Sequence, residues 1–307
     1  MATLTAEATL NTTFNFSTGH HLATAKSTTV HTTEYRKPVA INRVTVSADS
    51  SILAQQPAVI YNGSSSEFQI TSNFQSNFAD DGTIISLVTW IKPSATIGGT
   101  TQGIFGLFQG TSDQKGIQLR IDSAGSFNGT LVFGNVRQIY GGRAYSHRLY
   151  STFFSAGITN WTCIMICLEV GGGSSSVKHM WYNNNNASPT LNPSSSSGFT
   201  TSGTLYPVIG NNNGGGDFFN GAIGPIWMTD EEIDFSVAAN RQKFTDVGST
   251  GGIADLGADG ATPTGTQPKI FIKGTATTIT QHGSLSIGSG TITRGNLTNS
   301  FRGVHNV

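Results

Sequence analysis

The chain has 307 residues, with 17 basic and 17 acidic side chains, a formal net charge of zero and a pI near 7.1. Because no overall field draws such a chain to polyanions, this balance argues against nucleic acid and acidic membranes as partners. Glycine is frequent, at 38 residues, and charged residues make up only 11% of the chain against a usual ~25%. This composition favours a β-rich chain with large turns over one rich in solvated helices.

Residues 1–56 are rich in Thr and Ala and show no helical periodicity. The stretch VAINRVTVS (39–47) predicts a strand, and we expect the rest to be extended. The start, MATLTAEATLNTTF, has neither a positive region nor an apolar run, so it predicts no secretory signal. No segment approaches a membrane span. We interpret 1–56 as an arm that attaches the chain to a particle or a neighbouring subunit; the alternative is an edge strand or a disordered end.

Two strands are predicted next. YNGSSSEFQI (61–70) is a turn followed by an alternating strand, and IISLVTWIKPS (84–94) is a strand that ends at a proline. Further along, Cys163 and Cys167 lie four residues apart on one strand, about 13 Å from each other on the same face. That distance is too long for a disulfide, so we expect free thiols that pack in the core and, without a neighbouring His, no metal site.

The richest stretch is 206–244. Its apolar run 207–210, its turn 211–216 and its aromatic run 218–227 predict a hairpin. Thr229 and Glu232 have the Thr-x-x-Glu spacing of a capping box, which predicts a helix of one or two turns that begins there. The four tryptophans fall in strand-like runs and are expected to pack in the core: Trp90, Trp161, Trp181 and Trp227.

The order of these segments carries a resemblance. Tyr-Asn-Gly-Ser at 61–64, I-S-x-x-x-W-I-K-P at 85–93, V-I-G at 208–210, FNGAIGPIWM at 219–228 and EEI at 231–233 together resemble the laminin-G-like, concanavalin A-like jelly-roll domains. Residues 160–170 and 177–186 look like the paired central strands of that family. The tail LGADGATPTGTQPKIFIKG (256–274) resembles a segment that follows such domains in structural proteins of tailed bacteriophages.

The resemblance covers 57–274 and implies an all-β, two-sheet antiparallel jelly-roll sandwich over those residues. It leaves 1–56 as an extended N-terminal arm, and the short alternating runs of 275–307 predict a hairpin-like C-terminal extension. We expect the chain to fold in a reducing cytoplasm, yet its composition, rich in Ser, Thr and Asn, is that of an exposed protein. This combination agrees with a virion protein that is assembled inside the host.

Catalysis is not expected. Glucanases on this scaffold carry Glu-x-Asp-x-x-Glu on one strand, and the nearest match has Glu232 and Asp234 but Val237 in place of the second Glu. No Gly-x-Ser-x-Gly elbow is present. No cofactor is expected either. Laminin-G-like domains often hold Ca²⁺, and four aspartates in turn-like segments are weak candidates for it, although turn formation alone explains them: Asp80, Asp81, Asp113 and Asp217.

The predicted recognition surface is the segment 135–157, which interleaves aromatic and basic side chains: Arg137, Tyr140, Arg143, Tyr145, His147, Arg148 and Tyr150. Aromatic faces stack on sugar rings, and guanidinium groups bind hydroxyls or carboxylates. An acidic glycan of the host surface is one ligand that fits. A protein interface within a homo-oligomer and ordinary strand packing are the alternatives.

We therefore predict a non-catalytic structural protein of a phage particle, exposed on head or tail, that serves decoration and reinforcement or adhesion to the host. Its partners would be other virion proteins and further copies of itself, with no nucleic acid and no membrane. The alternatives are a carbohydrate-binding tail fibre or receptor-binding protein, a glycan hydrolase, and a bacterial surface adhesin.

Overall fold

The computed structural model describes residues 57–70, 74–75, 83–94, 101–109, 115–123, 129–139, 142–154, 161–170, 178–183, 185–187, 190–193, 204–211, 216–245, 253–285, 292–295 and 298–301. For 74–75, 129–139, 142–154, 190–193, 292–295 and 298–301, and for a few strand ends, it describes the backbone alone. Gln56–Arg302 forms one compact unit. The predicted arm 1–56 and its strand 39–47 lie outside the described residues.

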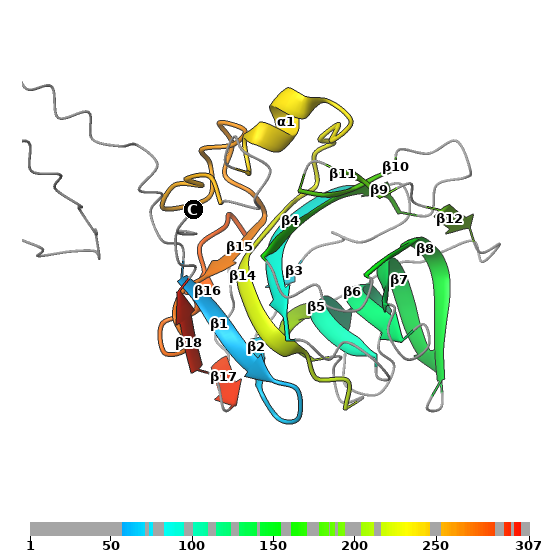
Figure 1. Cartoon of the computed structure of the whole chain (residues 1–307), viewed down its shortest axis with the longest axis vertical. Helices are drawn as coiled ribbons and strands as arrows, with labels where there is room; N and C mark the ends of the chain where they lie inside the picture. The colour runs from blue at the N-terminus through cyan, green and yellow to red at the C-terminus, as the bar shows by residue number, and fades with distance from the viewer. Residues whose placement is uncertain are drawn as a thin grey trace, which may run out of the picture. The chain divides into compact units, whose positions relative to one another are not determined.

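Two antiparallel sheets build this unit (Figure 1). Sheet A contains β1 (Pro57–Asn62), β4 (Ile84–Pro93), β9 (Thr162–Glu169), β10 (Lys178–Tyr182), β11 (Asn185–Asn186), β14 (Asn220–Thr229), β15 (Ile270–Lys273), β16 (Thr280–Gln281) and β18 (Thr298–Phe301). Its order is β11-β10-β9-β4-β14-β1-β18, and β15 pairs with both β14 and β16. A bulge at Gly224 and Pro225 divides β14, which pairs with β1 before the bulge and with β15 after it.

Sheet B contains β2 (Glu67–Ile70), β3 (Phe74–Gln75), β5 (Gln102–Gln109), β6 (Lys115–Ser123), β7 (Gly129–Ile139), β8 (Gly142–Phe154), β12 (Thr190–Pro193), β13 (Thr204–Ile209) and β17 (Ile292–Gly295). Its order is β12-β8-β7-β6-β5-β13-β2-β17, with β3 beside β13. The predicted all-β, two-sheet antiparallel sandwich is therefore confirmed. The jelly-roll and laminin-G-like subtype stays a prediction.

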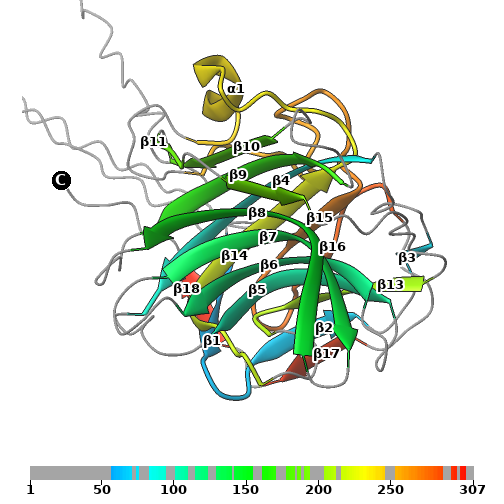
Figure 2. The same ribbon diagram turned by 90° about the vertical axis from the view of Figure 1, so that its right-hand side faces the viewer.

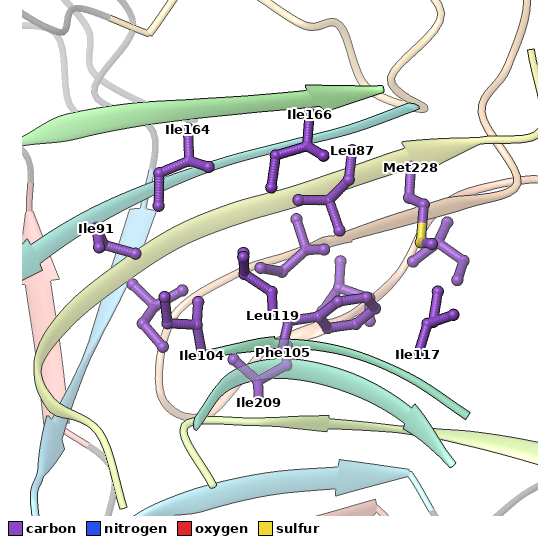
Figure 3. Packing of buried hydrophobic residues seen from close by; sticks show 14 of the residues in the cluster. Leu87, Ile91, Ile104, Phe105, Ile117, Leu119, Ile164, Ile166, Ile209 and Met228 are labelled. Carbon is purple, nitrogen blue, oxygen red and sulfur yellow. The ribbon is translucent and has the colours of Figure 1, made fainter. Parts of the chain in front are cut away.

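The main core lies between the two sheets (Figure 3). Alternate side chains of β4 and β9, such as Leu87 and Ile166, meet Phe105, Ile117 and Leu119 from β5 and β6. All five are fully buried. This packing follows from the period of two along a strand, which sends every second side chain to the same face.

Sheet A is buried on its other face as well, which explains why β9 is apolar at every position from Cys163 to Leu168. Val88, Trp90, Met165 and Trp227 alternate with the residues of the main core and form a second apolar cluster. The segment after β14 and the short helix α1 (Ala238–Gln242) cover this face, together with part of the chain around 253–271: Ile233, Phe235, Phe244, Ile253, Leu256 and Phe271.

Most of the predicted core residues lie in this second cluster. Cys163 and Cys167 are buried there as thiols outside any disulfide, as expected. Trp90 and Trp227 are fully buried and Trp161 nearly so. Trp181 differs, because it lies near the sheet edge on β10, is only half-buried, and stacks under the guanidinium of Arg241 at 3.7 Å from the ring centroid.

The predicted capping box is wrong. Thr229 is the last residue of β14, residues 230–237 form turns, and α1 begins only at Ala238, with Val237 at its N-cap. A hydroxyl from a distant strand takes the place of the cap: Ser86 Oγ on β4 donates to the Glu231 carbonyl at 2.6 Å and accepts from the Ile233 N–H at 2.9 Å. These two bonds anchor the segment to β4 of sheet A.

The predicted hairpin over 207–227 is also wrong, since β13 belongs to sheet B and β14 to sheet A. The connection between them crosses from one sheet to the other. Gly210 has φ +78°, its N–H donates to the Ile104 carbonyl at 3.0 Å, and its carbonyl accepts from the Phe219 N–H at 2.8 Å. A Cβ at Gly210 would lie 1.9 Å from Cδ1 of Tyr61, so the buried ring fills the space that a side chain would need.

The described part of 275–307 contributes β16 and β18 to sheet A and β17 to sheet B. β17 pairs with β2 in sheet B, and β18 pairs with β1 in sheet A. The last two described strands therefore join opposite layers of the sandwich.

Candidate functional site

The face of sheet B that points away from the main core is the candidate site. Leu107, Ile117 and Leu119 point into the core. Because side chains alternate along a strand, the intervening residues of β5 and β6 belong to the opposite face, which we call the outer face.

Strand register groups the outer face into three rows, because directly opposite residues of antiparallel strands lie on the same face. The Arg120 row contains Thr190, Tyr150, Val132, Arg120 and Gly103; the Gln118 row contains Asn192, Arg148, Gly134, Gln118, Gly106, Val208 and Gln69; the Phe108 row contains Tyr145, Val136, Gly116, Phe108 and Tyr206. Each row draws its residues from at least five strands, and several of these strands are far apart in the sequence.

Among the side chains that the structure describes, the outer face is polar at one end and apolar at the other. Arg120 Nη2 donates to Asp122 Oδ2 at 2.9 Å, and both side chains keep some exposure, at 11% and 25%. Phe108, Val208 and Gln118 are buried, and Tyr206 is half-buried against the first two. A Cβ at Gly106 would lie 2.2 Å from Phe108 Cε2, so the ring occupies the space above this glycine.

The β7–β8 hairpin bends sharply. Figure 2 shows both ribbons turning so that the end of the hairpin runs across the direction of the neighbouring strands. The bend coincides with a register shift between Asn135 and Val136, where β8 passes from His147 to Tyr145. Such a bulge adds an unpaired residue on one strand and increases its local twist.

The structure divides the predicted recognition residues into groups. Arg148 and Tyr150 occupy the Gln118 and Arg120 rows, and Tyr145 occupies the Phe108 row. His147 instead shares its row with Asn135 and the core residue Ile117.

The remaining predicted residues lie toward the end of the hairpin. Arg137 is opposite Ala144, and Arg143 is opposite Gln138. Tyr140 lies outside the described residues.

Several residues of the outer face escaped the sequence analysis, among them Gln118, the Arg120–Asp122 pair and Tyr206. The alternation in KGIQLRIDS (115–123) contains a signal for three of them, because Gln118, Arg120 and Asp122 occupy every second position between Ile117, Leu119 and Ile121. No local pattern links them to Tyr206 or to Asn192.

The acidic residues considered for catalysis lie elsewhere, on the segment that covers sheet A. Glu232 is exposed and residues 230–237 are not a strand, so the Glu-x-Asp-x-x-Glu spacing does not direct side chains to one face. Asp234 Oδ1 accepts from Ser236 Oγ at 2.5 Å and from the Ser236 N–H at 2.8 Å, and His179 Nε2 lies 3.4 Å away. The hydrogen bond from the Ser236 hydroxyl is the main cause that lowers the pKa of Asp234, against a smaller opposing effect of burial. Asp234 is thus an ionised acceptor that orders its own turn.

Within the described ranges, no three His, Cys, Asp or Glu side chains gather in a way that would hold a metal ion. Of the weak calcium candidates, Asp80, Asp81 and Asp113 lie outside those ranges. The backbone carbonyl of Asp217 accepts from the Gly103 N–H at 2.9 Å. In the same part of the chain no helix has the length and apolar character needed to cross a membrane.

Comparison with known proteins finds no matching family model and no matching curated protein. Among solved structures, the chain is similar to the CBM40 of the Ruminococcus gnavus IT-sialidase bound to alpha2,6 sialyllactose, with 10% identity, 59% of this chain and 94% of that chain covered, and a TM-score of 0.37.

Two other similar structures are the binding domain of botulinum neurotoxin serotype C1 (11% identity, 58% and 45% covered, TM-score 0.37) and tailspike protein 2 of an Escherichia coli O157:H7 bacteriophage (14% identity, 54% and 22% covered, TM-score 0.34). These scores are too low for the likenesses to bear on what this chain does.

Proposed function

We propose that the chain is a non-catalytic structural component of a bacteriophage particle that adheres to carbohydrate on the host surface through the outer face of sheet B. The phage assignment is supported by the order of segments over 57–274, above all LGADGATPTGTQPKIFIKG. Adhesion is supported by the residues that the sheet register assembles.

The observation that carries the adhesion proposal is the make-up of the Arg120 and Gln118 rows. They bring Arg148, Tyr150 and Asn192 into register with Gln118 and Arg120 across β12, β8, β7 and β6. Amide and guanidinium groups hydrogen-bond to sugar hydroxyls, and tyrosine rings stack on sugar faces. Gly103 and Gly134 in the same rows carry no side chain that would keep a ligand from the backbone, whereas the Phe108 ring fills the space above Gly106.

The mechanism is binding without turnover. No opposed pair of carboxylates accompanies the rows, because the strands that form them contain two acids that are each bonded elsewhere: Asp122 accepts from Arg120, and Glu67 accepts from Asn211. Each contact is individually weak. Several copies on one particle would convert weak contacts into firm attachment, since the second and later contacts form at a high effective concentration.

The test is binding of the purified full chain to immobilised surface polysaccharide of the host. The double variant Arg148→Gln/Tyr150→Ala removes one guanidinium and one ring from the rows. We expect it to bind at least about tenfold more weakly, equivalent to roughly 1.4 kcal/mol. The control is Lys92→Gln, an exposed residue of β4 in sheet A, which should bind like the parent chain.

Three outcomes would count against the proposal. Equal binding by the double variant and the control would remove the outer face from the mechanism. Release of reducing sugar by the parent chain would contradict the absence of catalysis. A chain that antibodies detect on purified particles but that binds no host polysaccharide would leave reinforcement of the particle as its role.

A further inference from the structure

The N-terminal arm joins the sandwich beside an edge of sheet A. β1 begins at Pro57, directly after residues 1–56, and Pro57 lies opposite Phe301, the last residue of β18. β18 is the last strand in the order of sheet A, and its other side pairs with none of the strands that the structure describes. The backbone N–H and C=O groups on that side offer a place where a further strand can pair.

The edge at β18 lacks the features that usually prevent pairing with another chain, which are a proline, a charge or a very short strand. At the other ends of the two sheets, β12 contains Pro193, β17 contains Arg294, and β11 has only two residues. β18 has the sequence TNSF, with neither a proline nor a charge over four residues. Beside it on β1, Ile60 lies opposite Thr298 and is 38% exposed, one of two large apolar side chains that are exposed in the described ranges. Of these edges, β18 is the one best suited to accept a strand.

The arm contains a segment that fits such an edge. Five of the nine residues in VAINRVTVS (39–47) are β-branched, a composition that favours strands. Residues 48–56 connect this segment to β1, and nine residues span at most about 30 Å when they are extended. The segment can therefore reach an edge that lies within that distance of Pro57.

The direction of pairing decides whether that edge belongs to the same chain or to another copy. All strand pairs that the structure describes are antiparallel, so we expect an added strand to run antiparallel to β18 and hence parallel to β1. Within one chain, two parallel strands of a sheet need a crossover connection of roughly a dozen residues or more. Residues 48–56 are too few for this connection. The edge of a second copy imposes no such requirement.

We propose that residues 39–47 of one copy pair with the open edge of β18 in a second copy, and that this exchange of arms builds a homo-oligomer. The inference goes beyond the proposed adhesion and does not depend on it. Main-chain hydrogen bonds along the added strand supply the affinity. Because each copy gives one strand and accepts one, the exchange closes on itself in a symmetric assembly.

The first test is self-association of the full chain, measured by sedimentation velocity over a range of concentrations. We expect the parent chain to form a discrete oligomer. Val44→Pro removes a main-chain donor from the middle of the added strand and should weaken association by at least about tenfold. Ala54→Pro, in the connecting residues 48–56, is the matched control and should associate like the parent chain.

The second test identifies which chains are joined. A chain with Thr45→Cys is mixed with a chain of different size that carries Thr298→Cys, and the mixture is treated with a short bismaleimide. The native thiols of Cys163 and Cys167 are buried and should not react. We expect a covalent product that contains one chain of each size. Replacing the second chain by one with Lys243→Cys, an exposed position after α1, should give no such product.

The outcomes separate this proposal from the adhesion proposal. A parent chain that stays monomeric at every concentration, or a Val44→Pro variant that associates as the parent chain does, would overturn the exchange of arms. Cross-linking that occurs only within single chains carrying both new cysteines would also overturn it, because the arm would then occupy its own edge. Binding of a soluble host oligosaccharide should be the same for the parent chain and the monomeric variant. If neither binds it, adhesion is contradicted and the exchange of arms stands.

Discussion

We expect the side chain of Arg241 to hold the segment 230–245, which covers the second face of sheet A, against β10. It is buried, and its Nη1 donates to the carbonyls of Phe235 at 2.6 Å and Ser236 at 3.0 Å. Its guanidinium also lies over the ring of Trp181 on β10. One side chain therefore joins the turn before α1, the helix itself and an outer strand of the sheet.

The substitution Arg241→Met keeps most of the apolar stem and removes the charge. Two hydrogen bonds from a charged donor are worth roughly 1.5–3 kcal/mol each, and the cation–π contact about 0.5–2 kcal/mol. Release of a buried charge to water in the unfolded state offsets part of this sum. We expect a net loss of about 2–4 kcal/mol in the free energy of unfolding, which lowers Tm by about 4–16 °C for a unit of this size.

The assay is urea unfolding followed by far-UV circular dichroism, with Lys243→Met as the matched control. Lys243 follows α1 and is exposed, so its variant should stay within about 0.5 kcal/mol of the parent chain. A loss for Arg241→Met no larger than that of the control would refute the reasoning. A double-mutant cycle with Trp181→Leu then measures the cation–π contact alone, and it should give a coupling of at least about 0.5 kcal/mol.

Three further results are expected. Both cysteines are buried, and burial raises the pKa of the Cys167 thiol to about 11; because a reagent cannot reach either thiol, both should resist it at pH 8 in the folded chain and react fully in denaturant. Gly210→Ala should lose about 2–5 kcal/mol, from a positive φ and a clash with a buried ring, whereas Gly216→Ala, with φ +72° and open space around it, should lose only about 1–2 kcal/mol. Burial, assisted by Lys273, lowers the pKa of His282, so the folded chain binds fewer protons there than the unfolded chain; stability should fall as the pH drops below about 6.5, and His282→Gln should reduce that fall.

The strands of the core are visible in the sequence because their period and composition are local properties. β4 ends at Pro93 as predicted, and β9 and β10 pair as the resemblance implies. The unbroken apolar run from Cys163 to Leu168 in β9 also indicates burial on both faces. What covers its second face is a segment about 70 residues later in the chain, which no local pattern connects to it.

The two errors in 206–244 have the same physical origin. A glycine-rich turn between apolar runs is compatible with a hairpin and with a crossing between sheets, and the buried ring of Tyr61 decides between them. Thr-x-x-Glu is likewise compatible with a helix start, but Ser86 supplies better partners to the backbone of Glu231 and Ile233 from 145 and 147 residues away. In both places a distant contact outweighs a local preference.

The candidate site was predictable only in part for a similar reason. The sequence shows that Arg148 and Tyr150 are close together in an aromatic and basic segment. It does not show the bulge that separates them from Arg137 and Arg143, nor the register that aligns Arg148 with Gln118. Rows across a sheet are set by pairing between strands, and each pairing depends on the whole fold.

The chain has no net charge, but its basic and acidic residues are concentrated in different parts of the fold. This separation weakens the conclusion that a neutral chain is not attracted to acidic partners. β6, β7 and β8 carry five basic residues and one acid, whereas the described residues 230–245 and 253–260, which belong to the segment covering the far side of sheet A, carry six acids and two basic residues. Sheet A lies between the two groups, so about two layer spacings, roughly 20 Å, separate them. Because the screening length at physiological salt is only about 8 Å, a ligand at one side feels little of the charge at the other. Net charge therefore gives no measure of the attraction between sheet B and an acidic surface. Such a surface would also orient the chain so that its acidic side faces away from that surface.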